Sequence, residues 1–476
     1  MAIIGGGIAG LALAAELAEL DGRLVDRAGG TRPELRIVLL ERENQFSYHS
    51  SGRSISSFSE SVGGAQQRAL TRASRTVLDA LGAESGTPLL RTRPIVWVAA
   101  QEHLASLNAL LTANPSLRPV DLAGAQTLCP VLRPEAVARA AVERTAQDVD
   151  VDALLQQYRD RATAAGAILR TAIGLESGVR DGGASAAWHP SGTSSTSNTP
   201  ATPAPSDTPA TPAASATSDA RATPAPSDTR ANPAPSDTPA ASDARATPAL
   251  SGEPTTPAPS SRPAALAPSG GPARASLPTG PLVSAGSDGV SWRLTTDRGE
   301  LVAGYVVNAA GPWADAVAAR LGADPAGLTN LRRTVAIASA ERVGPAWPLV
   351  IDVADAYYFR PERGGLLISP ADETPSPPTD AVAAPESVAL AIERITASTT
   401  LRLTRVRTSW AGLRTFAPDR NPIVGPDPNQ DGLYWFTALG GTGIQTAPAL
   451  ARLAAAQLLG EPYEIPDLRP EALLPR

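Results

Sequence analysis

Three glycines near the start of the chain have the spacing of a dinucleotide-binding turn. Gly5, Gly7 and Gly10 follow a short apolar run and open a stretch rich in Ala and Leu. In a G-x-G-x-x-G turn the first glycine permits the tight turn, the second lets backbone approach a pyrophosphate, and the third lets helix and strand pack closely. The N-terminus of the helix then faces the anion. These residues therefore predict a strand, a turn and a helix that hold a dinucleotide.

An acidic residue at the end of the next predicted strand completes this unit. Residues 36–41, RIVLLE, predict a second parallel strand ending in Glu41, whose carboxylate can bind ribose hydroxyls. Glu41 follows Gly10 by 31 positions (41 − 10), against about 20 in the usual unit. We expect the excess to form a lengthened surface loop over residues 21–34. Because almost nothing precedes the first strand, we also expect the true start to lie upstream. The alternative is a glycine-rich turn before an ordinary buried helix.

Two more segments have residue types suited to lining a cofactor. Residues 45–63 are crowded with hydroxyls, which favours either an exposed loop or a loop whose N–H and hydroxyl groups line a cofactor. Residues 432–437 predict a strand that runs into the glycine turn GGTG at 440–443 and then into a helix from about Gln445. A second helix N-terminus of this kind suits an oxygen-rich ring edge.

The composition excludes several kinds of chemistry. All 41 basic residues are Arg, and the absence of Lys rules out Schiff-base and Lys-base mechanisms. Cys129 is the sole cysteine, and His49, His103 and His189 are scattered, so we expect no metal cluster and no disulfide within the chain. A net charge of −6 gives no broad affinity for nucleic acid. We see neither a leader nor a membrane-spanning segment, and expect a cytoplasmic protein.

The middle of the chain has the composition of a disordered insertion. Pro, Ala, Ser, Thr and Asp dominate residues 183–287, and short units such as ATPAPSDT recur. Such a tract cannot bury enough apolar surface to offset its ordering entropy. Strands predicted at 290–296 and 300–307 follow it, so we predict a hairpin loop expanded into a long excursion without catalytic function, with His189 solvated near its edge. The alternative is an arm that binds a partner protein.

Downstream segments predict the sheet of a second domain. Short apolar runs bounded by turn residues are typical of antiparallel strands. We predict such strands at 331–339, 348–352, 357–360 and 365–369.

Motifs along nearly the whole chain outside the insertion resemble the D-amino-acid oxidase family of FAD-dependent oxidoreductases. They are GGGIAG, LLERE, YHSSGRS, PVLRPEAV, DVDVDALLQQYRD, VVNAAGPWAD, RRT, WPLVIDVADAYYFRP, SWAGLRTF and GGTGIQT, in that order. Within the family they are most similar to FAD-dependent D-arginine dehydrogenases. The resemblance implies an α/β fold with a Rossmann-like FAD-binding domain and a second α+β substrate domain on an antiparallel sheet. The implied FAD-binding segments are 1–85, 145–182, 288–328 and 410–476, and the implied substrate-domain segments are 86–144 and 329–409.

The resemblance implies a non-covalent FAD site. No Cys or His occupies residues 440–445, which would meet the flavin. His49 is expected to be a loop histidine beside FAD and not a base. The implied cofactor contacts are Gly5, Gly7, Ala9, Gly10, Glu41, Arg42, Ser50, Ser51, Gly52, Arg53, Ser54, Ile55, Ser56, Ser57, Gly174, Gly311, Gly440, Gly441, Thr442, Gly443, Ile444 and Gln445.

The resemblance also implies a site for a small amino-acid substrate. Arg333 and Arg414 would bind the α-carboxylate and Tyr358 would orient it, so that Tyr358 and Arg414 are the implied catalytic residues. Gly441 and Gln445 would lie near the amine. The alternatives are a structural ion pair for Arg414, a core tyrosine, and an exchange of roles between Arg333 and the arginine before it.

Three positions depart from the D-arginine dehydrogenase pattern. Ser57 stands where that pattern has a histidine of the flavin loop, Val62 where it has a lid tyrosine, and Ile95 where it has the glutamate that binds the substrate guanidinium. A buried cationic side chain would lack a partner at Ile95. The departures therefore predict a substrate with a small or apolar side chain.

The predicted reaction is oxidation of the Cα–N bond of an amino acid, with hydride passing to the flavin. The electron acceptor is left open between oxygen and a quinone. The alternatives are oxidation of a 2-hydroxy acid or an N-methyl amino acid on the same scaffold, and a flavin-binding protein that has lost catalysis.

Overall fold

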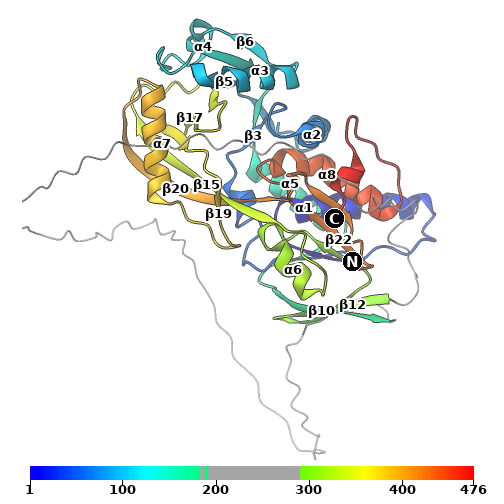
Figure 1. Ribbon diagram of the computed structural model, residues 1–476. Helices are drawn as coiled ribbons and strands as arrows, with labels where there is room; N and C mark the ends of the chain where they lie inside the picture. The colour runs from blue at the N-terminus through cyan, green and yellow to red at the C-terminus, as the bar shows by residue number, and fades with distance from the viewer. Residues whose placement is uncertain (183–187, 191–289) are drawn as a thin grey trace, which may run out of the picture. The chain divides into compact units, whose positions relative to one another are not determined.

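The computed structural model describes residues 1–182, 188–190 and 290–476, and one of its layers is a mainly parallel sheet (Figure 1). The strand order is β21-β22-β14-β1-β2-β9. Only β21 runs antiparallel to its neighbour. The strands are β1 (Ala2–Ile4), β2 (Val38–Leu40), β9 (Ile168–Arg170), β14 (Val306–Asn308), β21 (Ile423–Pro426) and β22 (Leu433–Thr437). The carboxyl ends of the parallel strands share one edge of the sheet, which is where open α/β sheets bind ligands.

Four helices belong to this layer of the structure. They are α1 (Ile8–Arg27), α2 (Ala65–Ser85), α5 (Val151–Ala164) and α8 (Gly443–Leu459). α1 packs against α5, α8 and the sheet, and α2 packs against α8. The Ala- and Leu-rich faces of α1 and α8 supply the core, with Leu11, Leu13 and Leu450 completely buried.

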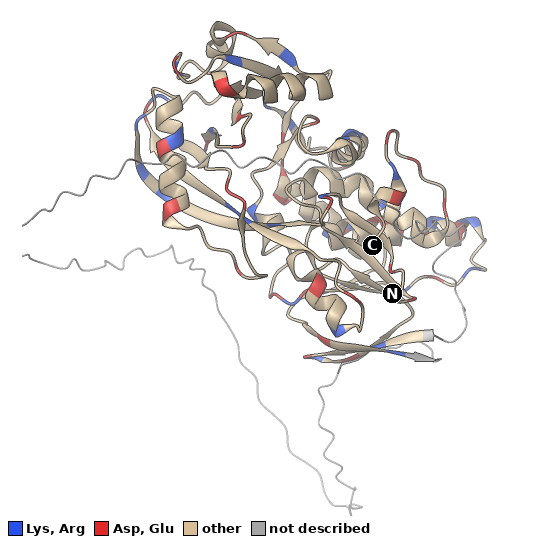
Figure 2. Ribbon diagram, viewed as in Figure 1, with Lys and Arg blue, Asp and Glu red and all other residues tan. Residues whose placement is uncertain are grey.

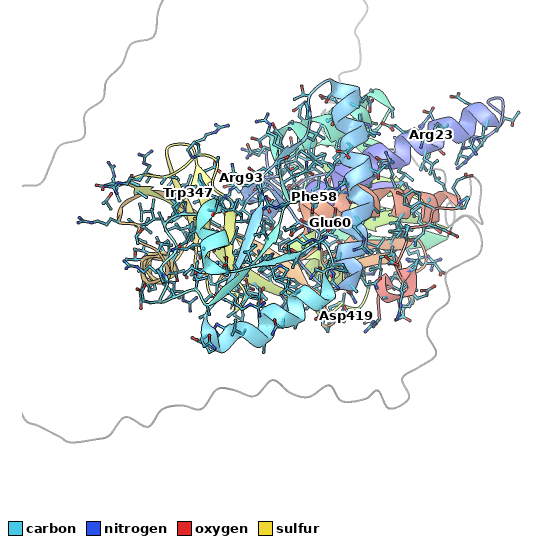
Figure 3. All side chains as sticks on the ribbon, turned by 90° about the horizontal axis from the view of Figure 1, so that it is seen from above. Arg23, Phe58, Glu60, Arg93, Trp347 and Asp419 are labelled. Atoms are coloured by element: carbon cyan, nitrogen blue, oxygen red, sulfur yellow. The ribbon has the colours of Figure 1, made fainter. Side chains whose placement is uncertain are left out.

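The first helix is longer than predicted. α1 continues to Arg27, so the predicted surface loop over 21–34 is wrong in its first half. Asp21 explains the extension, because its side chain is almost completely buried, accepts the N–H of Leu35 at 2.7 Å and pairs with Arg32 at 3.1 Å. These contacts fold the end of the loop back onto the helix. Figure 3 labels Arg23 on this extended part of α1.

A nine-stranded sheet forms the second layer. Its order is β19-β15-β18-β17-β16-β5-β7-β6, with β20 paired to β15. The four predicted strands are present here, but β16 runs parallel to β5. The strands are β5 (Ile95–Ala99), β6 (Arg118–Val120), β7 (Arg139–Glu143), β15 (Thr329–Ala340), β16 (Leu349–Asp352), β17 (Tyr358–Glu362), β18 (Gly365–Ser369), β19 (Thr374–Pro375) and β20 (Leu403–Phe416). Together the two sheets confirm the predicted α/β fold class with an antiparallel second sheet.

A four-stranded sheet flanks the insertion. β10 (Leu175–Gly182) and β12 (Val290–Thr296) pair antiparallel, with Gly182 opposite Val290, as predicted for an expanded hairpin. The single strand predicted at 300–307 is instead split between β13 (Gly299–Ala303) and β14. β11 (Trp188–Pro190) pairs with β13. The predicted disorder of residues 183–287 stays a prediction, and most of these residues lie outside the described ranges.

The remaining elements join these layers. They are α3 (Leu104–Ala113), α4 (Leu122–Leu128), α6 (Ala314–Arg320), α7 (Pro385–Ser398), β3 (Ser57–Phe58), β4 (Leu90–Thr92), β8 (Gln147–Val149), and the 3-10 helices η1 (Ser50–Arg53), η2 (Gln101–His103), η3 (Gly311–Trp313) and η4 (Pro470–Leu473). In the view of Figure 2, acidic and basic residues are interspersed along the helices and loops. None of the helices in the described ranges has the length and apolar character needed to cross a membrane.

We expect the insertion to be dispensable for the fold. Replacing residues 193–272 by a short Gly/Ser linker leaves β10, β11, β12 and β13 intact. Since loop-closure entropy grows slowly with loop length, the free energy of unfolding should change by only about 1 kcal/mol. Thermal and denaturant unfolding of the shortened chain would measure this change. A decrease of more than about 3 kcal/mol in the free energy of unfolding would be well beyond the change expected from loop-closure entropy. It would show that the insertion stabilises the fold.

Candidate functional site

A cavity of about 250 Å³ lies along the carboxyl ends of the parallel strands and reaches the second sheet. Ile4, Leu40 and Thr437 mark the ends of β1, β2 and β22 in its lining, and Val335 and Tyr358 mark its boundary with the nine-stranded sheet. The cavity therefore combines the two surfaces at which the sequence predicts a cofactor and a substrate. Within the described residues, no group of His, Cys, Asp and Glu is arranged to hold a metal ion.

The first glycine turn has the steric features that a close-packed phosphate loop requires. Gly5 has a φ of +111°, and a Cβ at Gly10 would lie 2.0 Å from the carbonyl oxygen of Gly5. A Cβ at Gly7 would lie 3.1 Å from Ser51 Oγ. The turn therefore brings bare backbone to the cavity, which side chains would block.

Two helix N-termini line the cavity without an acidic residue of their own. α1 begins after Gly7 and α8 begins at Gly443, and neither has a side-chain cap or an acid in its first turn. Gly7, Gly443 and Ile444 all contribute to the cavity lining. Ser51 Oγ accepts the first N–H group of α1, that of Ile8, and the helix dipole at both starts favours a bound anion. The residues present therefore fit the phosphates and the oxygen-rich ring of a flavin dinucleotide.

Glu41 holds the glycine turn to β2. Its carboxylate accepts the N–H groups of Gly6 and Glu43, both at 2.8 Å. Both Glu41 and Arg42 line the cavity. The ribose contact assigned to Glu41 stays a prediction.

The hydroxyl-rich segment connects the glycine turn to the second sheet. Ser51 Oγ accepts the N–H of Ile8 at 3.0 Å, and Ser50 Oγ donates to the carbonyl oxygen of Leu413 at 2.7 Å. Arg53 donates to the carbonyl oxygens of Ala381 and Ala411 at 2.9 and 3.0 Å. This segment is therefore a structured wall of the cavity and not the exposed loop that was the alternative.

His49 lies in this wall as a loop histidine, in agreement with the prediction. Its Nε2 lies 3.0 Å from Glu43 Oε1, and its ring centre lies 4.4 Å from that of Trp313. Trp313 also lines the cavity and has the Arg42 guanidinium 5.6 Å from its ring centre. No role was predicted for Trp313, although its place just after β14, at the carboxyl edge of the sheet, is a usable signal.

Arg333, Tyr358 and Arg414 meet at the far end of the cavity. Leu331 of β15 is opposite Arg414 of β20, so Arg333, two residues along β15, lies on the same face as Arg414. The Arg333 guanidinium carbon lies 6.0 Å from the centre of the Tyr358 ring, which β17 contributes. Three strands thus converge on one polar end of the cavity.

The polar groups at this end are buried but incompletely paired. Arg333 is 5% exposed and Tyr358 4% exposed, and Arg333 Nε and Tyr358 Oη have no hydrogen-bond partner among the described residues. Burial, followed by the positive charge of Arg333, holds the pKa of the Arg414 guanidinium below its ordinary value. A carboxylate placed here would pair with the donors and relieve the repulsion between the two guanidinium groups. The arrangement is suited to binding an anion.

The second glycine turn lies directly against Arg414. A Cβ at Gly441 would lie 2.7 Å from Arg414 Cζ, and a Cβ at Gly440, whose φ is +58°, would lie 2.5 Å from a ring carbon of Phe416. The Arg414 guanidinium therefore packs against the turn at a position where only glycine leaves room for it.

Gly441→Ala is expected to displace the Arg414 guanidinium and to leave the fold intact. The added methyl would raise the concentration of a carboxylate ligand needed for half-saturation by roughly tenfold, because a charge-assisted pair would lose its geometry. Ligand titration of the purified protein would measure this. Gly412→Ala is the matched control on β20, since a Cβ there meets nothing closer than 3.7 Å. Equal effects of the two substitutions would contradict the proposed fit.

Gln445 does not line the cavity. It is 4% exposed, its Oε1 accepts the N–H of Ser59 at 3.0 Å, and its Nε2 donates to Ser59 O at 3.2 Å and to Thr71 Oγ1 at 3.0 Å. Ser59 Oγ in turn donates to the buried Glu143 at 2.7 Å. The side chain is therefore committed to a structural network, and its predicted contact with a substrate amine has no support in this geometry.

Val62 and Ile95 lie behind the polar end and not in the cavity lining. Both belong to an apolar cluster that includes Val335 and Tyr358. Their contacts are therefore with the residues that line the cavity and not with the cavity itself. The other predicted site residues outside the lining are Gly10, Gly52, Ser56, Ser57, Gly174 and Thr442, whereas Gly5, Gly7, Ala9, Ser54, Ile55, Gly311, Gly440 and the remaining ones lie in it.

Comparison with known proteins agrees with this geometry. The family model described as "FAD dependent oxidoreductase" matches residues 1–201 and 279–457. FAD-dependent oxidoreductase domain-containing protein 1 of Bos taurus is 31% identical over 186 residues, which cover 35% of this chain and 37% of that protein. The chain therefore matches little more than a third of the length of this curated relative.

Solved structures show the same fold at low identity. Glycine oxidase from Geobacillus kaustophilus is 17% identical, with a TM-score of 0.64 over 100% of this chain and 98% of that one. L-proline dehydrogenase from P. horikoshii is 15% identical, with a TM-score of 0.64 over 98% of this chain and 94% of that one. These neighbours share the arrangement of the two sheets.

Proposed function

Because the chain belongs to the FAD dependent oxidoreductase family, whose model matches most of its length, we propose that it oxidises the Cα–N bond of a small amino acid to an imino acid. The observation that carries the proposal is the convergence of Arg333, Tyr358 and Arg414, with unpaired buried donors, at one end of the cavity. The glycine turn at the start of α1 lines the same cavity. FAD, when bound, supplies the hydride acceptor.

The cofactor would be held without a covalent bond. The N-terminus of α1 and the bare turn around Gly7 suit a pyrophosphate, and the turn at 440–444 with the start of α8 suits the flavin ring. Residues 440–445 contain neither Cys nor His. The segments implied for FAD binding, 1–85, 145–182, 288–328 and 410–476, contain every strand of the six-stranded sheet.

The substrate would be bound through its carboxylate. Arg414 and Arg333 would pair with its two oxygens, and Tyr358 Oη would donate a further hydrogen bond that fixes its orientation. Held at this point, the amino acid presents Cα to the cavity that Ser50, Ser51 and residues 53–55 help to line. The chain's own contribution to the reaction is therefore binding and orientation.

We propose a substrate with a small or apolar side chain, and a D-amino acid before an L-amino acid. Ile55 and Val335 line the cavity near the arginines, and Ile95 lies behind them where a cation-binding carboxylate would be required for D-arginine. The preference for the D-enantiomer rests on the resemblance to D-arginine dehydrogenases alone. The glycine and L-proline in the names of the structural neighbours are likewise small substrates.

Anaerobic mixing with a panel of possible donors tests the proposal. We expect D-amino acids with apolar side chains to bleach the flavin band near 450 nm (a rough value for flavins) faster than their L-enantiomers or D-arginine. Reduction by 2-hydroxy acids or by N-methyl amino acids alone would favour those alternative reactions. A yellow protein that no donor bleaches would favour a flavin-binding protein without catalysis.

A further inference from the structure

A carboxylate of the chain itself contacts the guanidinium groups of the substrate site from outside the cavity. Glu373 Oε1 lies 3.4 Å from Arg333 Nη2 and 3.8 Å from Arg414 Nη1. Both arginines line the cavity, whereas Glu373 does not. A substrate carboxylate and Glu373 would therefore interact with the same two positive charges.

Glu373 is held at this place by its neighbours in sequence. Asp372 accepts the backbone N–H of Thr334 at 2.7 Å and its hydroxyl at 2.8 Å. Thr374 is paired with Arg332 in the β19–β15 ladder. Because the residues on both sides are fixed to β15, the backbone of Glu373 is held beside the two arginines.

A third arginine binds Glu373 more closely than the two of the site. Arg420 Nη2 lies 2.9 and 3.2 Å from the two carboxylate oxygens, and its guanidinium carbon lies 3.8 Å from the centre of the Phe416 ring. Its side chain is 52% exposed and, like Glu373, does not line the cavity. The ion pair with Arg420 thus partly neutralises the Glu373 carboxylate. Without Arg420, this carboxylate would interact more strongly with Arg333 and Arg414.

We propose that Glu373 sets the affinity of the Arg333–Arg414 site by competing with the substrate carboxylate, and that Arg420 limits this competition by binding Glu373. This inference rests on the proposed function, because it requires that the two arginines bind a carboxylate. It assigns opposite effects to two residues in contact with each other. A purely structural pair would give effects of the same sign.

Benzoate is a suitable probe, because it is a monocarboxylate with an apolar body and has no amine to oxidise. Titration into the purified flavoprotein, followed by the change in flavin absorbance, gives a Kd without turnover. We expect Glu373→Gln to lower this Kd by about tenfold, since a unit charge near two guanidinium groups is neutralised. We expect Arg420→Gln to raise it by roughly fivefold, because Glu373 is released toward the site.

The double variant and a control complete the test. Glu373→Gln/Arg420→Gln should bind benzoate within about twofold of Glu373→Gln, because Arg420 acts through Glu373. Asp355→Asn removes a carboxylate that is 64% exposed and 4.0 Å from the same Arg333 nitrogen, and should have a much smaller effect.

Weaker benzoate binding in both single variants, or an effect of Arg420→Gln that persists in the double variant, would overturn the inference. Both results would leave the proposed function standing, since benzoate would still bind beside the flavin. If benzoate changes the flavin absorbance neither in the variants nor in the unmodified protein, the assignment of the carboxylate site is wrong, and the inference is wrong as well. Unchanged flavin content and melting temperature would show that each variant is folded.

Discussion

Replacing Arg414 by Leu should lower the second-order rate constant for flavin reduction by about 10³-fold while the protein keeps its flavin. Loss of a buried, charge-assisted pair with the substrate carboxylate amounts to roughly 4 kcal/mol, which corresponds to this factor. Leu retains the apolar volume of the side chain. The guanidinium lies where β20 meets the turn at Gly441.

Stopped-flow reduction under anaerobic conditions would measure the effect over a range of substrate concentrations. We expect the half-saturating concentration to rise far more than the limiting rate falls, because the interaction binds substrate before the reaction begins. Arg332→Leu is the control, since Arg332 is adjacent to Arg333 in sequence but does not line the cavity. If Arg332→Leu lost as much rate as Arg414→Leu, the assignment of the carboxylate site would be wrong.

Gly10→Ala should abolish flavin binding and destabilise the fold by about 3 kcal/mol or more. This is the effect expected when an added methyl group meets backbone atoms that cannot move aside. Its Cβ would lie 2.0 Å from the carbonyl oxygen of Gly5, and the atom it meets is backbone within the glycine turn. Either α1 moves away from β1 or the turn loses its shape. Both outcomes displace the helix N-terminus from the cavity, so the purified variant should be colourless.

Gly22→Ala is the matched control on the same helix. A Cβ at Gly22 meets no atom within 4 Å, so Ala should be neutral or should stabilise α1 by up to about 1 kcal/mol. The ratio of flavin to protein absorbance and the melting temperature would compare the two variants. A yellow, stable Gly10→Ala protein would show that close packing at this turn is not what forms the cofactor site.

The parts of the fold that could be predicted are those specified by local rules. The glycine turn follows from steric demands within six residues, and the short apolar strands of the second sheet follow from their turn residues. The length of α1 could not be predicted, because it depends on Asp21 meeting Arg32 and Leu35 across a turn. β20 escaped prediction because residues 404–408 are exposed on both faces and show no apolar period, although they pair with β15.

In the candidate site, too, some features could be predicted from the sequence and others depend on contacts between distant segments. The resemblance located Arg333, Tyr358 and Arg414, and the structure brings them together. A resemblance does not give the direction of a side chain, and Gln445 shows this, because its side chain bonds to Ser59 and Thr71. Glu373 had no sequence signal, since it lies in a loop without a motif and meets its partners only through the folding of β15 and β20.

Single-turnover product analysis tests amino-acid oxidation by this protein. The protein is reduced anaerobically by one apolar D-amino acid, and the 2-oxo acid and ammonia released after hydrolysis of the imino acid are counted against the flavin reduced. We expect one equivalent of each per flavin. Reduction without ammonia, or no reduction by any amino acid, would contradict this expectation.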